Sequence, residues 1–196
     1  MLASRAPFGR LRPSVVLRTM SAARWRSFSS YEQVDVGGAV TAVRPSTSIN
    51  LVPRGFVDTT HTGLHPLLRW MAQKDSLGQD MLLLAPPAER RRARHLALAF
   101  CELIRAEVEC VTISADTTES DLKQRRELDG RGGVSWSDAP PVRAALAGRV
   151  LILDGLERAE RNVLPTLNNL LENRELSLDD GRLLVERRHI IAATAA

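Results

Sequence analysis

The clearest candidate for chemistry in this chain is Asp154, a carboxylate at the end of an unbroken apolar run. Residues 150–153 read Val-Leu-Ile-Leu, which is typical of a strand buried in a parallel sheet. A carboxylate in this place reaches the sheet edge where ligands bind, and it can hold Mg²⁺ directly or through water. Asp154 is therefore the candidate metal ligand and a candidate catalytic residue. The alternative is structural, with Asp154 only capping the helix that follows.

Phosphate hydrolysis also needs a base that deprotonates the attacking water. The position after Asp154, where such sites ordinarily carry a glutamate, holds Gly155. Loss of such a base typically costs about 10²- to 10⁴-fold in rate. Glu157 lies two residues beyond Gly155 and is the candidate catalytic substitute if the turn folds back. A nucleotide hydrolase with this sequence is expected to be slow.

A second segment, residues 81–92, reads as a strand followed by a phosphate-binding loop. The loop pattern G-P-P-G-x-G-K-[ST] needs glycines so that backbone N–H groups surround the phosphates, then a lysine, and a hydroxyl for Mg²⁺. This chain keeps the two prolines, whereas alanines and arginines replace the other groups. A Cβ hinders the approach of backbone to phosphate, and an arginine does not fit a lysine's slot. The candidate cofactor-binding residues are Pro86, Pro87, Ala88, Arg90, Arg91 and Arg92, with Arg91 at the lysine position.

Apolar spacing along the chain alternates between strand and helix patterns. It predicts strands at 81–84, 108–113, 150–154 and 189–194, and helices at 61–75, 91–106, 116–128, 141–147 and 162–172. Strand, turn, helix and strand in this order form the parallel crossover unit, so we expect an α/β fold. Residues 175–185 are expected to form a β-hairpin around Asp-Asp-Gly-Arg.

Charge separates an N-terminal leader from the rest of the chain. Residues 1–31 hold six arginines and no acid, so the net charge of +4 becomes −2 without them. The basic balance belongs to the leader, and we expect no nucleic-acid partner. Arg-rich and Ser-rich composition without a long apolar stretch is typical of a disordered mitochondrial transit peptide and predicts a matrix location. A basic tail of another kind or a plastid signal is the alternative.

The remaining residues divide into a linker and one core. Residues 32–60 are Val-, Gly-, Pro- and Thr-rich without a sustained period, and we interpret them as a linker with one short strand. Residues 61–196 are long enough for a single hydrophobic core. No apolar run approaches the roughly 18 residues that a membrane helix needs, so we expect no membrane span.

Several stretches together resemble one family. Residues 133–138 (Gly-Val-Ser-Trp-Ser-Asp), 142–144 (Val-Arg-Ala), the strand ending at Asp154, and 162–172 (Asn-Val-Leu-Pro-Thr-Leu-Asn-Asn-Leu-Leu-Glu) resemble the AAA+ ATPases of the dynein-related and MoxR group. The resemblance implies a three-layer, P-loop NTPase-type parallel sheet with flanking helices and a β-hairpin insertion. It implies that the core is incomplete at its C-terminus, with the lid domain absent.

The same resemblance implies ATP and Mg²⁺ as cofactors, with ATP binding and hydrolysis as the activity. It also implies an oligomer built with other AAA+ modules or subunits. Thr194, in the last expected strand, is then the candidate for the residue that senses the nucleotide. Two functions stay open: a module that binds ATP·Mg²⁺ and hydrolyses it slowly, and a non-hydrolysing structural module. The family favours the first, whereas the altered loop favours the second.

Overall fold

A parallel sheet forms the centre of the structure, which is a computed structural model. The structure describes residues 32–44, 46–57, 65–128, 130, 132–185 and 190–195. The strands are arranged in the order β3-β10-β7-β4, and each neighbouring pair is parallel. The expected parallel sheet is therefore confirmed. The four strands are β3 (Met81–Ala85), β4 (Val108–Thr112), β7 (Val150–Asp154) and β10 (Ile190–Ala195).

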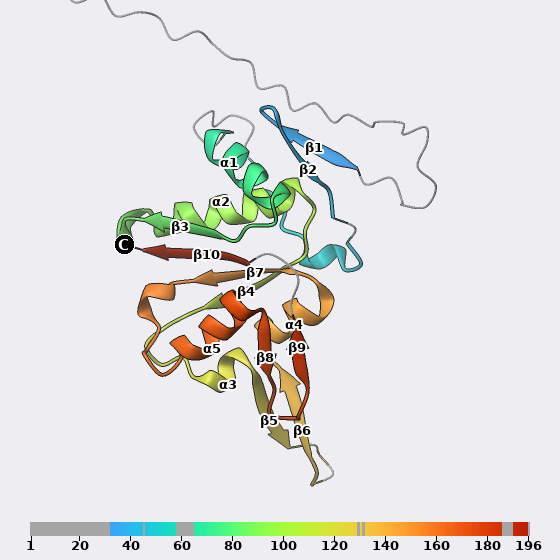
Figure 1. Ribbon diagram of the computed structural model, residues 1–196, viewed down its shortest axis with the longest axis vertical. Coiled ribbons are helices and arrows are strands. Elements are labelled where there is room, and N and C mark those ends of the chain that lie inside the picture. Colours follow the sequence, from blue (N-terminus) through green and yellow to red (C-terminus); the bar gives the residue numbers. More distant parts are fainter. Residues whose placement is uncertain are drawn as a thin grey trace, which may run out of the picture.

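Both faces of the sheet are covered, because alternate residues of β7 enter different hydrophobic clusters. Val150 and Ile152 pack in a cluster with residues of α1 (His65–Ser76) and α2 (Arg90–Leu103). Leu151 and Leu153 pack with residues from the segments around α3, α4 and α5. Successive side chains of a strand point to opposite faces, so the domain has three layers. In Figure 1, α1 and α2 lie on one side of the strands, and α3 (Glu119–Leu122), α4 (Pro140–Ala147) and α5 (Leu164–Asn168) on the other.

Strand β3 differs from the expected buried strand. All five residues of β7 are buried, whereas β3 alternates, with Leu82 52% and Leu84 65% exposed. Within the described residues β3 pairs only with β10 and forms one edge of the sheet. Its apolar run does not distinguish an edge strand from a central one, since both read as consecutive apolar residues.

The helix ends follow local sequence signals. Pro140 and Pro141 open α4, and Gly148 ends it in the left-handed conformation with φ 65°, as the sequence predicts. A 3-10 turn, η3 (Pro87–Glu89), leads into α2, and another, η4 (Leu156–Arg158), follows β7. α5 continues into a π-helical turn at Asn169–Asn173, so the expected helix over 162–172 is present in two parts.

Residues 119–128 and 134–138 form a short helix and two paired strands instead of the helix expected to residue 128. Thr118 and Asp121 form a capping box at the start of α3, yet the helix ends at Leu122. β5 (Gln124–Leu128) then pairs antiparallel with β6 (Val134–Asp138). Charged residues have little strand preference, so the pairing with β6 outweighs the local helical pattern. In Figure 1 this hairpin extends away from the sheet.

The expected linker also folds back onto the core in its described part. β1 (Gln33–Val36) and β2 (Ala39–Ala42) form an antiparallel hairpin, and a 3-10 turn, η1, covers Ile49–Leu51. Val34 and Val36 are buried in the cluster that includes α1 and α2. Each strand has only four residues, which is too short to show a sustained period.

The expected hairpin over residues 175–185 is confirmed. β8 (Glu175–Ser177) and β9 (Leu183–Val185) pair antiparallel, with Gly181 in the turn at φ 87°. The leader, residues 1–31, and residues 61–64 of the first expected helix lie outside the described residues. None of the described helices is long and apolar enough to cross a membrane.

Candidate functional site

The candidate site lies where the parallel strands end. The register aligns Asp154 with Thr112 on β4 and with Ala193 on β10, and it aligns Thr194 with Leu84 on β3. The carboxyl ends of all four strands therefore meet at one sheet edge. In open α/β sheets this edge is where ligands bind. The fold brings the loop after β3 and the carboxylate after β7 to the same edge, as their sequence positions predict.

Asp154 is held there by two arginines of α2. Its side chain is 7% exposed, and its Oδ1 accepts a hydrogen bond from Arg90 Nε at 3.0 Å. Its Oδ2 lies 3.6 Å from Arg94 Nη1. Arg90 and Arg94 are four residues apart on α2, so they share one face of the helix. A single carboxylate is thus paired with two cations.

Gly155 makes room for the Arg90 guanidinium. It has φ +88°, a conformation that strongly favours glycine, and a Cβ built on it would overlap Arg90 Nη2. The same Cβ would lie 3.0 Å from the Ile113 carbonyl oxygen. The Arg90 guanidinium therefore occupies the space that a glutamate side chain at position 155 would need. No side chain fits at position 155 unless Arg90 moves.

The loop after β3 is folded as a tight turn. Pro86 has φ −56°, and Glu89 donates its backbone N–H to the Pro86 carbonyl at 2.8 Å. No described residue from 86 to 92 has positive φ, the conformation that lets successive N–H groups converge on an anion. Pro86, Pro87, Ala88, Arg91 and Arg92 are exposed at this edge. A phosphate bound at this loop would therefore be contacted by side chains more than by converging backbone N–H groups.

The remaining predicted site residues occupy separate positions. Glu157 is exposed in η4 and lies 3.5 Å from Arg158 Nε. Arg92 is paired with Glu89 at 3.6 Å on the helix surface. Thr194 lies in β10 next to the strand-end position that aligns with Asp154. Sequence reasoning missed Arg94, although its spacing of four from Arg90 is a signal for a shared helix face.

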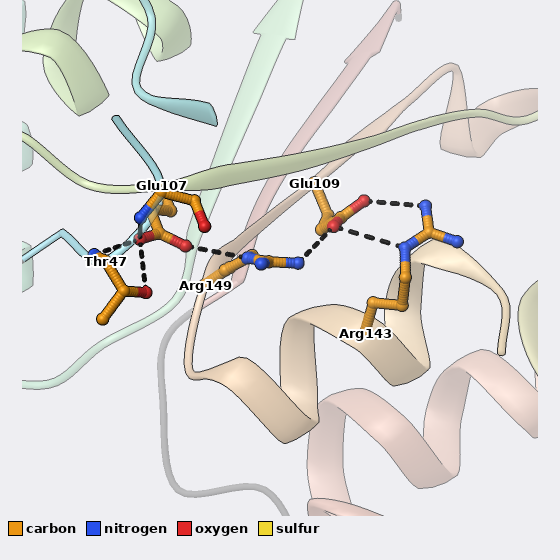
Figure 2. Close-up of polar contacts among 6 residues, drawn as sticks. Thr47, Glu107, Glu109, Arg143 and Arg149 are labelled. Carbon is orange, nitrogen blue, oxygen red and sulfur yellow. Dashed lines mark hydrogen bonds and ion pairs between the residues drawn. The ribbon is translucent and has the colours of Figure 1, made fainter. Parts of the chain in front are cut away.

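A second polar cluster lies at the opposite ends of β4 and β7. Figure 2 shows Arg149 between two carboxylates: its Nε is 2.9 Å from Glu107 Oε2, and its Nη1 is 2.8 Å from Glu109 Oε1. Arg143 Nη2 lies 2.9 Å from the other oxygen of Glu109. This chain of ion pairs joins β4 to α4 and to the start of β7. This cluster lies at the end of the strands opposite to Asp154, and it stabilises the fold.

Glu107 also holds the N-terminal segment. Its Oε1 accepts hydrogen bonds from the backbone N–H groups of Thr47 and Ser48, both at 2.6 Å, and from the Thr47 hydroxyl at 3.0 Å. The Ser48 N–H, then Arg149 and Thr47, lower the pKa of Glu107 from 4.5 to about 2. The carboxylate stays ionised and anchors residues 47–48 to the sheet.

Comparison with known proteins identifies the family behind this geometry. The AAA domain (dynein-related subfamily) matches residues 90–194, which is more than half of the chain and includes α2, Asp154 and Thr194. The chain belongs to the dynein-related subfamily of AAA domains. It is an AAA+ module with a P-loop NTPase-type α/β fold. The fold class expected from the sequence is therefore confirmed.

A curated relative of this AAA domain is von Willebrand factor A domain-containing protein 8 of Mus musculus. The two are 48% identical over 157 residues, which is 80% of this chain and 8% of the relative. The chain therefore spans a small fraction of the length of the relative it matches. A crystal structure of a proposed ATPase from Cytophaga hutchinsonii is also similar, with a TM-score of 0.47 and 13% identity over 75% of this chain and 41% of that one.

The family typically binds nucleotide with Mg²⁺, and the donor set here does not fit the ion. Mg²⁺ requires oxygen ligands in octahedral geometry. The Asp154 carboxylate already faces two guanidinium groups, and Gly155 and Arg92 stand where a second carboxylate and a hydroxyl would be. Among the described residues, no group of three or more His, Cys, Asp or Glu side chains is arranged to hold a metal.

Proposed function

We propose that this chain is an ATP-binding module of an AAA+ ATPase and that its own ATP hydrolysis is slow. The observation that carries the proposal is the meeting of Arg90 and Arg94, in the first turns of α2, with the buried Asp154 at the strand ends. The N-terminus of a helix that follows a parallel strand favours phosphate groups. Arginine side chains add charge and donors that suit phosphate oxygens.

Slow hydrolysis follows from the chemistry around Asp154. Gly155 supplies no base, and the candidate substitute Glu157 is exposed and faces Arg158. The absence of a positioned base lowers the rate by about 10²- to 10⁴-fold. The expected Mg²⁺ role of Asp154 would require the carboxylate to leave Arg90. We therefore propose ATP binding as the main activity of this module and ATP hydrolysis as a slow, minor one.

A titration tests the proposal directly. ATP added to the full chain in a calorimeter is expected to bind with Kd of about 1 mM, which corresponds to about −4 kcal/mol. Adenosine is the matched control and is expected to produce no binding heat, because the proposed contacts are to phosphates. Phosphate release is expected to stay about 10²- to 10⁴-fold below that of an AAA module with the glutamate. Absence of ATP binding at millimolar concentration would contradict the proposal.

A second candidate function is a non-hydrolysing structural module. The ion pair between Arg90 and Asp154 favours it, because the carboxylate is already neutralised without a ligand. In this function the domain packs against other AAA+ modules or subunits of an oligomer. The titration separates the two candidates, since a purely structural module takes up no ATP.

We also propose a mitochondrial matrix location, on the composition of residues 1–31. Six arginines without an acid are typical of a segment imported along the membrane potential. Deleting residues 1–31 from a fluorescent fusion of the chain is expected to abolish mitochondrial import, as seen by microscopy. The same deletion carrying a known transit peptide in its place is the control and is expected to restore import. Unchanged import of the deleted chain would refute the proposal.

A further inference from the structure

Arg90 and Arg94 supply positive charge at the candidate site, as a metal ion does in other nucleotide-binding sites. A divalent cation between a carboxylate and a nucleotide neutralises negative charge on both. Here Arg90 and Arg94 carry two positive charges around one carboxylate, so the cluster has a net charge of +1. The cluster lies at the sheet edge and at the start of α2, whose dipole adds to the positive potential. It attracts an anion without any added cation.

Arg90 keeps hydrogen-bond donors available beyond the one given to Asp154. A guanidinium has five N–H donors, and Arg90 uses Nε for Asp154 Oδ1 at 3.0 Å. Its Nη2 lies over Gly155, in the space that a side chain at this position would fill. Arg94 contacts Asp154 through Nη1 and is about half exposed. Both side chains can therefore hold phosphate oxygens while they stay paired with Asp154.

A magnesium ion at Asp154 would have to displace these groups. The Arg90 side chain is mostly buried, so a displaced guanidinium would stay close to a divalent cation of the same sign. Mg²⁺ also loses its water ligands reluctantly and demands near-octahedral oxygen coordination. Neither Gly155 nor Arg92 offers an oxygen ligand from its side chain. The arrangement disfavours the metal and retains the charge that phosphate needs.

We propose that the cluster of Arg90, Arg94 and Asp154 takes the place of Mg²⁺, so that this module binds the metal-free nucleoside triphosphate. The inference rests on the proposed function, because it concerns the ligand form taken at the same site. The preferred ligand is the tetraanion of ATP, which carries two more negative charges than the magnesium complex. The positive cluster therefore binds it at least as strongly as the complex.

The test compares ATP affinity with and without the metal. The full chain is titrated with ATP in EDTA and again in excess Mg²⁺. We expect the Kd in EDTA to be equal to or lower than the Kd in Mg²⁺. For Arg90→Gln, which leaves Asp154 paired only with the more exposed Arg94 among the described residues, we expect metal-free ATP to bind at least tenfold more weakly and Mg²⁺ to improve the affinity. Arg125→Gln removes the same charge from an exposed side chain of β5 that pairs with Asp121 of α3, and both affinities should stay within twofold.

The outcomes separate this inference from the proposed function. ATP binding that is more than twofold tighter in Mg²⁺ than in EDTA overturns the inference and leaves the proposed function intact. No ATP binding in either buffer overturns both. Equal or tighter binding in EDTA, lost in a folded Arg90→Gln variant, supports both. Circular dichroism of each variant before titration establishes that the variants are folded. If Arg90→Gln does not fold, Arg94→Gln replaces it, because it removes a positive charge of the same cluster from a more exposed side chain, and the same loss of metal-free ATP binding is expected.

Discussion

Replacing Arg149 by alanine is expected to lower the free energy of unfolding by about 3–5 kcal/mol. Removing one partner of a buried ion pair leaves the remaining charge buried without its counter-ion. The Arg149 side chain is 17% exposed and contacts the buried carboxylates of Glu107 and Glu109 (Figure 2). Among the described residues, Glu107 then keeps the hydrogen bonds from Thr47 and Ser48. Within the same described part of the chain, Glu109 keeps its pair with Arg143, whose side chain is more exposed.

Urea unfolding at neutral pH measures this loss. Arg125→Ala is the matched control, because Arg125 of β5 is exposed and its pair with Asp121 of α3 should contribute less than about 1 kcal/mol. A loss below about 1 kcal/mol for Arg149→Ala would show that the buried pairs contribute little more than surface pairs do.

The pH dependence of the same variant has a definite sign. The pKa of Glu107 is depressed from 4.5 to about 2 in the folded chain. Its contribution to stability is therefore complete above pH 4.5 and is lost as the pH falls toward 2. Arg149→Ala removes one cause of the depression, so the Glu107 pKa rises and its smaller contribution disappears at higher pH. Acid unfolding of the variant is expected to begin at a higher pH than that of the unchanged chain.

The parallel sheet was predictable because its strands are marked by short apolar runs. Val150–Leu153 is buried in the structure as its composition predicts. Two other features had weaker signals. The edge position of β3 depends on which segments pair with it, and β5 carries charged residues whose strand form depends on β6. Local patterns carry little information on such long-range pairing.

The candidate site was predictable in position and not in detail. Asp154 follows a buried strand, so its place at the sheet edge comes from the sequence. The contact between Arg90 and Asp154 depends on the direction of a long side chain across α2 and on the space left by Gly155. Neither is encoded in the spacing of the two segments. The sequence instead predicts Arg90 in the phosphate-binding loop and Asp154 as a metal ligand.

The Arg90–Asp154 ion pair gives the second large expected effect. Asp154→Asn is expected to lower the free energy of unfolding by about 3 kcal/mol, because it leaves the mostly buried Arg90 guanidinium without its carboxylate. Arg90→Gln is expected to cost a similar amount, reduced by the pairing that Arg94 still provides. The double variant is expected to cost clearly less than the sum of the two, because the second substitution removes a charge that the first left unpaired.

A double-mutant cycle on Arg90 and Asp154, measured by urea unfolding without nucleotide or metal, tests most directly whether the site is built around this pair. The exposed pair of Arg92 in α2 and Glu89 in the preceding turn is the control cycle, with an expected coupling below about 0.5 kcal/mol. For Arg90 and Asp154 we expect a coupling free energy of about 1–3 kcal/mol. Additivity within about 0.5 kcal/mol would contradict it, because Asp154 would then not depend on Arg90.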